Sequence, residues 1–297
     1  MTTSERRARR CRQGGAFSSC SSMACGGLVL FACAGASPSQ FVDGAGSPVA
    51  AFAEYARLVQ LPAGEGRARV VLQTSVRVLE KPRAGPEVVL IAMHHMSTRE
   101  YFRAVEEWLR GADVVVCEGV TEEDIVRSEA VNWVARYQAA VSGALGLFTQ
   151  GEWEATARDR RWRAIDARSV ADAVDEDPSG ILSERLKKQT VEVEEGAAHD
   201  AAARERLLRT VLAEGAPSDA MAMKIAGRPS EMARHKAMSV GLRALIDGSG
   251  DARIVVLYGA IHAYAIEGVL RALGFRSRSQ SWLDALEMTV DVPQQPK

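Results

Sequence analysis

Short apolar runs rich in Val, Ile and Leu recur along the chain. Runs of this length and composition are typical of strands buried inside a sheet. Between the first two runs, the Pro- and Gly-containing segment Lys81–Pro86 predicts a turn, so that these two runs form a hairpin. The predicted strands are Arg69–Leu79, Glu87–Met93, Asp113–Cys117, Arg161–Asp166 and Arg253–Tyr258.

Helical spacing of apolar residues separates these runs. In Thr98–Arg110, Tyr101, Phe102, Val105 and Leu109 fall on one helical face, and Gly111 ends the pattern. A strand, a helix and a further strand in this order favour a parallel crossover. Further helices are predicted over Pro48–Leu61, Glu122–Phe148, Leu182–Gly215, Asp219–Asp247 and His262–Leu273, and the tail Phe275–Val292 is expected to add one or two edge strands.

This alternation predicts an α/β fold. We expect a mixed, mainly parallel central sheet layered by helices, with a helical insertion at about 122–250. Residues 37–297 would form a single domain.

The first 36 residues have the layout of an export signal. Five arginines precede the apolar stretch Met23–Ala36, and Ala34-Gly35-Ala36 offers small residues at a cleavage site. Leu30–Cys33 also resembles a bacterial lipobox, with Cys33 as the lipidated residue. We therefore expect export to the periplasm or cell envelope, with removal of the leader or attachment to the membrane through it or a lipid. A later start at Met23 is the plainer alternative.

Charge and cysteine content narrow the function classes. The chain has 37 Lys and Arg against 38 Asp and Glu, a net charge of −1, so no basic excess points to nucleic acid. Beyond the leader only Cys117 remains of the five cysteines, so that part can form no internal disulfide. No P-loop and no GxGxxG follows a predicted strand, which gives nucleotide binding no support.

Residues that bind metals or carry protons follow the predicted strands. His95, Glu118, Asp166 and His262 each stand at or just beyond the end of an apolar run. Because ligands bind outside the carboxyl ends of strands in open α/β sheets, we expect these side chains to converge at one edge. The structural alternatives are a core histidine for His95 or His262 and a helix cap for Glu118 or Asp166.

Two imidazoles and a carboxylate form a mixed N/O ligand set. His95, Glu118 and His262 would suit a divalent ion such as Zn, Mn, Co or Fe and leave coordination positions open. A bound ion of this kind can activate water and polarise a carbonyl. Adjacent residues of a strand face opposite sides, so we expect only one of His94 and His95 to face the site.

Two segments carry a resemblance to a known family. Leu90–Val120, which contains His95 and Glu118, resembles the first motif region of the TraB/PrgY/GumN family, a relative of the Tiki proteases, and Val255–Phe275 resembles its second GxxH region. Val71–Val78, Leu145–Gln150, the strand ending at Asp166 and Arg234 follow in the family order. The resemblance covers about 70–275.

The resemblance implies site residues one by one. His95 and His262 match the motif histidines, Glu118 the acidic residue and Gly259 the second motif's glycine, and Asp166 matches the residue that ends the strand between the two motifs. Arg234 matches an arginine that would clamp a substrate carboxylate or steady an oxyanion, although His235 stands where Asn is common. Ala92 occupies the first motif's glycine position, which either a small backbone shift absorbs or a degraded site explains.

Two functions remain open. The first is an exported metal-dependent hydrolase, in particular a peptidase, acting on a peptide or small molecule with Glu118, Asp166 and Arg234 as catalytic residues. The alternative is a non-enzymatic envelope protein that binds a metal, haem or peptide, as the ChaN-like haem-binding proteins of the wider group suggest. A structural interaction protein without metal dependence is a third interpretation.

Overall fold

The computed structural model describes residues 52–64, 66–118, 129–165, 181–197, 199–226 and 229–291. The predicted leader, with Cys33, lies outside these residues, and so does Asp166. No helix within the described ranges is long and apolar enough to span a lipid bilayer.

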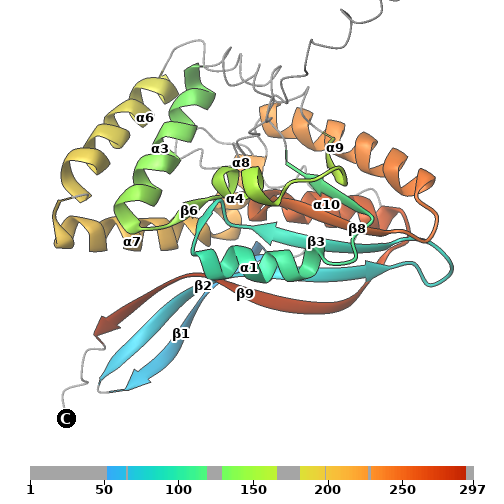
Figure 1. Ribbon diagram of the computed structural model, residues 1–297, viewed down its shortest axis with the longest axis horizontal. Coiled ribbons are helices and arrows are strands. Elements are labelled where there is room, and N and C mark those ends of the chain that lie inside the picture. The colour runs from blue at the N-terminus through green and yellow to red at the C-terminus, as the bar shows by residue number, and fades with distance from the viewer. Residues whose placement is uncertain are drawn as a thin grey trace, which may run out of the picture.

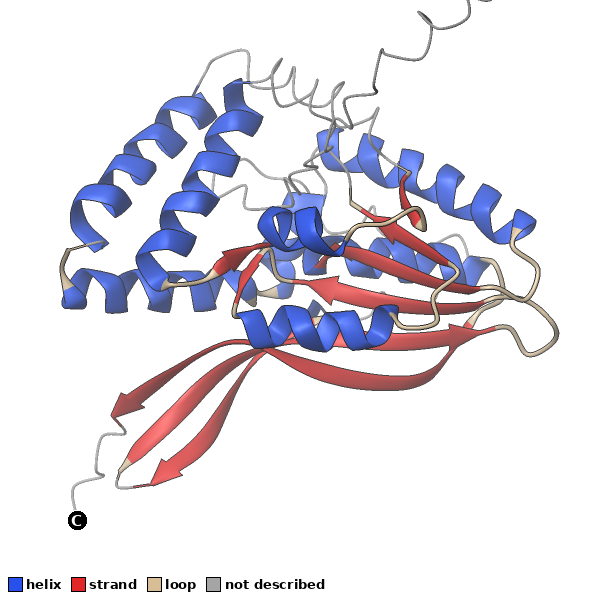
Figure 2. Ribbon diagram, in the orientation of Figure 1, coloured by secondary structure: helices blue, strands red, loops and turns tan. Residues whose placement is uncertain are grey.

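The predicted α/β class is confirmed (Figures 1 and 2). A sheet of seven strands has the order β1-β2-β3-β8-β5-β7, and β9 pairs with β2 beside this path. The strands are β1 (Ala56–Gly64), β2 (Arg67–Glu80), β3 (Glu87–Met93), β5 (Val114–Cys117), β7 (Trp162–Ala164), β8 (Arg253–Gly259) and β9 (Arg276–Asp291), and β4 (Met96–Ser97) pairs separately with β6 (Phe148–Thr149).

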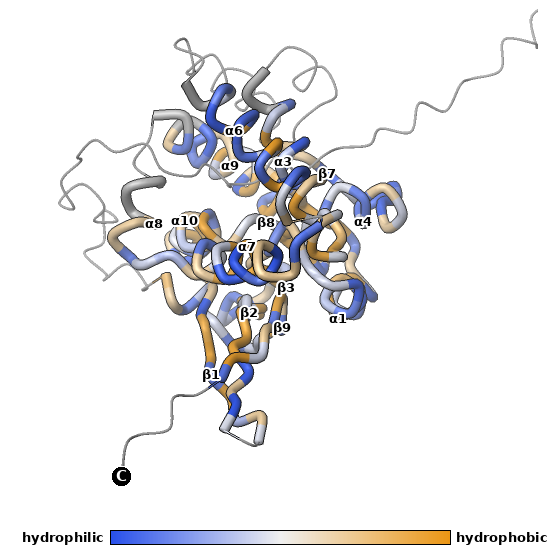
Figure 3. Tube along the Cα trace, turned by 90° about the vertical axis from the view of Figure 1, so that its left-hand side faces the viewer, coloured by the Kyte–Doolittle hydropathy of each residue, from blue (hydrophilic) through white to orange (hydrophobic). Residues whose placement is uncertain are grey.

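Helices cover both faces of this sheet. The helical segments are η2 (Phe52–Glu54), α1 (Arg99–Leu109), α3 (Glu129–Leu145), α4 (Gln150–Ala157), α6 (Ile181–Glu192), the π-helical turn η3 (Val193–Ala197), α7 (Ala201–Gly215), α8 (Asp219–Ala226), α9 (Pro229–Gly248) and α10 (Ala260–Ala272). In Figure 3 the traces of α6 and α7 change between hydrophilic and hydrophobic colours, as expected for helices that bury one face only.

Strand alternation divides the core into two layers. In β3, Val89, Ile91 and Met93 belong to a hydrophobic cluster shared with α1, α3, α6 and α7. The intervening residues Val88, Leu90 and Ala92 belong to a second cluster, shared with α8, α9 and α10. Because both faces of β3 are buried, its sequence is a continuous apolar run rather than an alternating one.

The pairing of the strands differs in part from the prediction. β2 and β3 form the expected antiparallel hairpin, and β3 and β5 are parallel as expected, but β8 lies between them and pairs with both. Among the seven strands, β2 runs against the other six. The ends of β3, β8 and β5 therefore meet at one edge, with Met93 opposite Gly259 and Cys117 opposite Leu257.

One helix prediction is wrong. Within Pro48–Leu61, residues from Ala56 onward form β1, which pairs antiparallel with β2 from Ala56 to Gly64. The propensity for a helix is overridden because β2 offers a long unpaired backbone edge. Together with β9, these strands form a ribbon that projects beyond the helices (Figure 1).

Ala92, the residue at the first motif's glycine position, causes no irregularity in β3. It pairs in regular register with Tyr258 of β8, and its side chain is fully buried in the core under α9 and α10. The methyl group thus occupies a core position, and the backbone accommodates it without a bulge.

Candidate functional site

The carboxyl edge of β3, β5 and β8 gathers four of the predicted site residues. His95 and Glu118 follow β3 and β5, His262 lies in the first turn of α10, and Arg234 comes from α9. All four are buried, and Glu118 has no exposed surface. We call His95, Glu118, Arg234 and His262 the strand-end cluster.

Glu118 is the centre of this cluster. One carboxylate oxygen, Oε1, lies 2.6 Å from Nη2 of Arg234 and 3.5 Å from Nε2 of His262. The other, Oε2, accepts the backbone N–H of Gly259 at 2.7 Å and lies 4.0 Å from Nε2 of His95. Burial by itself would raise the pKa of Glu118, but Arg234 and then His262 hold it well below the usual range. Glu118 is therefore a fixed anion.

His95 is oriented by Gln150, a residue that the sequence did not single out for a role. Nδ1 of His95 lies 2.7 Å from the side-chain carbonyl of Gln150, whose amide nitrogen donates to Glu154 at 2.7 Å. A carbonyl can only accept, so Nδ1 of His95 carries the proton and Nε2 presents its lone pair toward Glu118. Burial lowers the pKa of His95, which keeps the ring neutral. Histidines that bind metals are commonly oriented in this way, by a hydrogen bond from the ring nitrogen that does not bind the metal.

The neighbouring His94 lies elsewhere. Its Nδ1 contacts the carbonyl of Met96 at 2.5 Å, and its Nε2 packs against Gly215 at the end of α7. Burial lowers its pKa to about 4. The structure thus places His95, and not His94, beside Glu118.

His262 faces two sets of partners through its two ring nitrogens. Nε2 lies toward Glu118, whereas Nδ1 is 2.9 Å from Nε2 of His235 and 3.7 Å from Oε2 of Glu231. Glu231 and His235 are four residues apart on α9, and so share a helix face. The ligand atoms of Glu231, His235 and His262 all lie within 4.8 Å of one another, which makes this helix triad a candidate metal site.

Sequence reasoning missed most of the helix triad. His235 was noted only as a departure from the family pattern, and Glu231 was not noted at all. The available signal was the Glu-x-x-x-His spacing of Glu231 and His235 on a predicted helix, which indicates a shared face but not the partner that faces it. Asp166 cannot be placed, because it lies outside the described residues.

Gly259 permits the close approach of the site residues. Its φ of −48° is open to any residue, so the requirement for glycine is one of space. A Cβ built at this position would lie 2.6 Å from Nε2 of His95 and 3.2 Å from Oε2 of Glu118.

Gly259→Ala is expected to lower the free energy of unfolding by about 2 kcal/mol, because the methyl group overpacks a buried site. Urea denaturation checks this. Gly268→Ala in α10, the helix that Gly259 precedes, is the matched control: nothing lies within 4 Å of its Cβ, and alanine should leave stability equal or raise it. Equal behaviour of the two variants would contradict the steric interpretation of Gly259.

Comparisons of the chain with protein-family models, with curated proteins and with solved structures found no match.

Proposed function

We propose that this protein is an exported metal-dependent hydrolase, in particular a peptidase, whose reaction centre is the strand-end cluster. The observation that carries the proposal is the burial of His95, Glu118, Arg234 and His262 around one carboxylate, although they come from four separate segments. The resemblance to the TraB/PrgY/GumN family supports the same residues.

The donor types of the strand-end cluster suit a divalent ion such as Mn, Co or Zn, while among the described residues the helix triad is the set whose ligand atoms all lie within 4.8 Å of one another. His95 presents an oriented lone pair, and Nε2 of His262 is buried 3.5 Å from Oε1 of Glu118. His95, Glu118 and His262 would hold the ion, which would supply an activated water and a polarised carbonyl.

Glu118 and Arg234 would have different roles in the reaction. Glu118 holds a permanent negative charge, since its pKa is low, and is therefore a ligand rather than a general base at neutral pH. Arg234 neutralises part of that charge and is placed to stabilise negative charge that develops on a substrate oxygen.

Chelation and replacement of the site histidines test the proposal. We expect hydrolysis of a mixed peptide library to stop when the ion is removed and to return when Mn²⁺, Co²⁺ or Zn²⁺ is added. His95→Ala and His262→Ala should each lower the rate at least tenfold. His199→Ala, at an exposed histidine, is the control and should leave the rate unchanged. Turnover that survives chelation and both replacements would disprove the proposal.

One observation favours a second function, a non-enzymatic binding protein for a metal, haem or peptide. Both oxygens of Glu118 already have charged or N–H partners, so the cluster offers no free general base. Tight retention of a ligand without turnover would support this function, and an absorbance scan of the purified protein in the Soret region tests for haem.

A further inference from the structure

The helix triad differs from the strand-end cluster in its charge. Glu118 is paired with Arg234, whereas Oε2 of Glu231 is buried without a hydrogen-bond partner among the described residues. The side chain of Glu231 is 11% exposed and its carboxylate lies 3.7 Å from Nδ1 of His262. A buried carboxylate with an unused oxygen is costly unless a cation or proton satisfies it.

The separations within the triad suit metal coordination. Bonds of about 2.0–2.2 Å to N and O place two ligand atoms roughly 3.3 Å apart around a tetrahedral ion. Nδ1 of His262 lies 2.9 Å from His235 and 3.7 Å from Glu231, on either side of that value. Burial, His262 and Arg234 lower the pKa of His235 to about 3, so its imidazole is neutral and able to ligate.

A further polar atom stands next to the triad. The hydroxyl of Tyr264 is buried and has no hydrogen-bond partner within the described part of the chain. The Tyr264 ring contacts that of His235 edge-to-face, with centroids 5.8 Å apart. Burial and then the negative charge of Glu231 raise the pKa of Tyr264. Buried polar atoms without hydrogen-bond partners among the described residues thus come from both α9 and α10.

We propose that Glu231, His235 and Nδ1 of His262 form a second binding site for a divalent ion such as Zn²⁺ or Co²⁺. The inference stands on the triad and does not require the proposed hydrolase activity. A neutral imidazole has one N–H and one lone pair, so His262 serves the triad through Nδ1 or the strand-end cluster through Nε2, but not both at once. The helix triad and the strand-end cluster therefore compete for His262, and each chain binds one ion.

Measuring Co²⁺ binding by variants that each disable one of the two metal sites tests the proposed triad site. We expect His95→Ala to retain one Co²⁺ per chain with a ligand-field absorption spectrum, because the triad is intact. His95→Ala with His235→Asn should bind Co²⁺ at least 100-fold more weakly, and His95→Ala with Glu231→Gln at least tenfold more weakly. Far-UV circular dichroism and urea denaturation show that each variant is folded.

Gly259→Ala provides a second way to block metal binding at the strand-end cluster, because its methyl group occupies the space beside Nε2 of His95. This variant should keep its Co²⁺ and lose it when His235→Asn is added. Loss of all Co²⁺ by His95→Ala and by Gly259→Ala would overturn the triad while leaving the hydrolase proposal standing. Retention of Co²⁺ by the double variants would also overturn it. If Co²⁺ binds as expected but no peptide is cleaved, the hydrolase proposal fails and the triad stands.

Discussion

Arg234→Met is expected to lower the free energy of unfolding by about 3 kcal/mol at pH 7. The replacement leaves Glu118, which has no exposed surface, as a buried charge without its cation. Removing one member of a buried ion pair typically costs 3–5 kcal/mol because the desolvation of the other is no longer offset. Urea denaturation of the variant and of the wild-type protein measures the loss.

The free energy of unfolding of Arg234→Met is expected to depend on pH differently from that of the wild-type protein. In the wild-type protein the depressed pKa of Glu118 contributes stability that is present above its unfolded value of about 4.5 and lost as the pH falls below it. Without Arg234, burial is expected to raise that pKa, so the folded variant takes up a proton at a higher pH. Its deficit should therefore be largest at neutral pH and should shrink as the pH falls toward 4.5.

Arg243→Met is the matched control for Arg234→Met. Arg243 is an exposed arginine of the same helix, α9, and its replacement should change stability by less than about 0.5 kcal/mol. A deficit for Arg234→Met that stays constant between pH 7 and pH 4.5 would show that the charge of Glu118 is not its cause.

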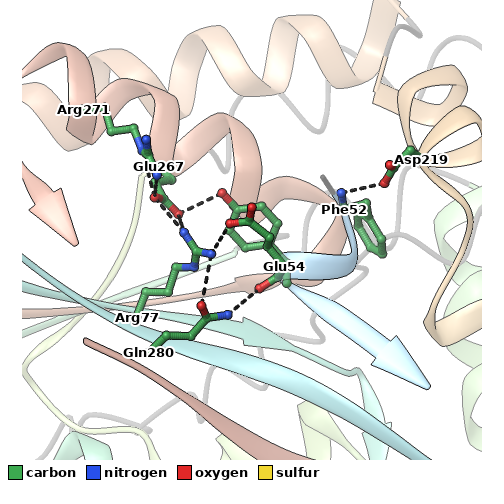
Figure 4. A network of polar contacts seen from close by, with 8 residues as sticks. Phe52, Glu54, Arg77, Asp219, Glu267, Arg271 and Gln280 are labelled. Carbon is green, nitrogen blue, oxygen red and sulfur yellow. Dashed lines mark hydrogen bonds and ion pairs between the residues drawn. The ribbon is translucent and has the colours of Figure 1, made fainter. Parts of the chain in front are cut away.

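Arg77→Met is expected to cost about 3 kcal/mol at a place remote in sequence from the site. Nη1 of Arg77 donates to both oxygens of Glu267, at 2.9 and 2.8 Å. Its Nη2 donates to the side chains of Glu54 and Gln280 (Figure 4). Arg77 is 4% exposed and Glu267 is 1% exposed, so the pair is desolvated. The loss of Arg77 leaves the buried carboxylate of Glu267 with only the half-exposed Arg271 as a cation.

This network bears on the site through α10. Glu267 lies on α10 five residues after His262, and it also accepts bonds from Tyr55 at 2.8 Å and from Arg271 at 2.7 and 2.9 Å. Arg77 belongs to β2, so the pair fixes the helix against the sheet. We therefore expect Arg77→Met also to weaken any ion bound through His262.

A double-mutant cycle separates the pair from the rest of the network. Arg77→Met with Glu267→Leu should be more stable than the sum of the single losses by about 1–3 kcal/mol, because no buried charge remains unpaired. Arg209→Met removes the half-exposed ion pair with Glu205 on α7 and should cost at most about 0.5 kcal/mol. Additive losses of Arg77 and Glu267 would contradict the proposed coupling.

The apolar runs of the sequence were sufficient to predict most strands. β3, β5 and β7 fall within predicted runs, and β2 and β8 extend beyond theirs by one or two residues at an end. Apart from the first residue of β3 and of β8, the strands β3, β5 and β8 are apolar throughout, because a strand buried on both faces must be. The strand-end positions of His95, Glu118 and His262 followed from the same runs. The order of the strands did not, since nothing local in β8 specifies that it enters between β3 and β5.

Local sequence patterns do not predict which residues from distant segments of the chain contact one another. Gln150 contacts His95 across 55 positions of sequence, and neither residue carries a signal of the other. The error at β1 has the same origin, because residues that favour a helix in isolation pair with β2 when its edge is available.

The sequence by itself determined the fold class and named the residues that meet at the sheet edge, because periodicity reports which face of an element is buried. Only the tertiary structure decided how those residues are used. It set Arg234 against Glu118, which makes the carboxylate a permanent anion, and it brought Glu231 and His235 to the second nitrogen of His262. These outcomes depend on the approach of α9 to α10, and the packing of two helices against each other is not encoded in either helix alone.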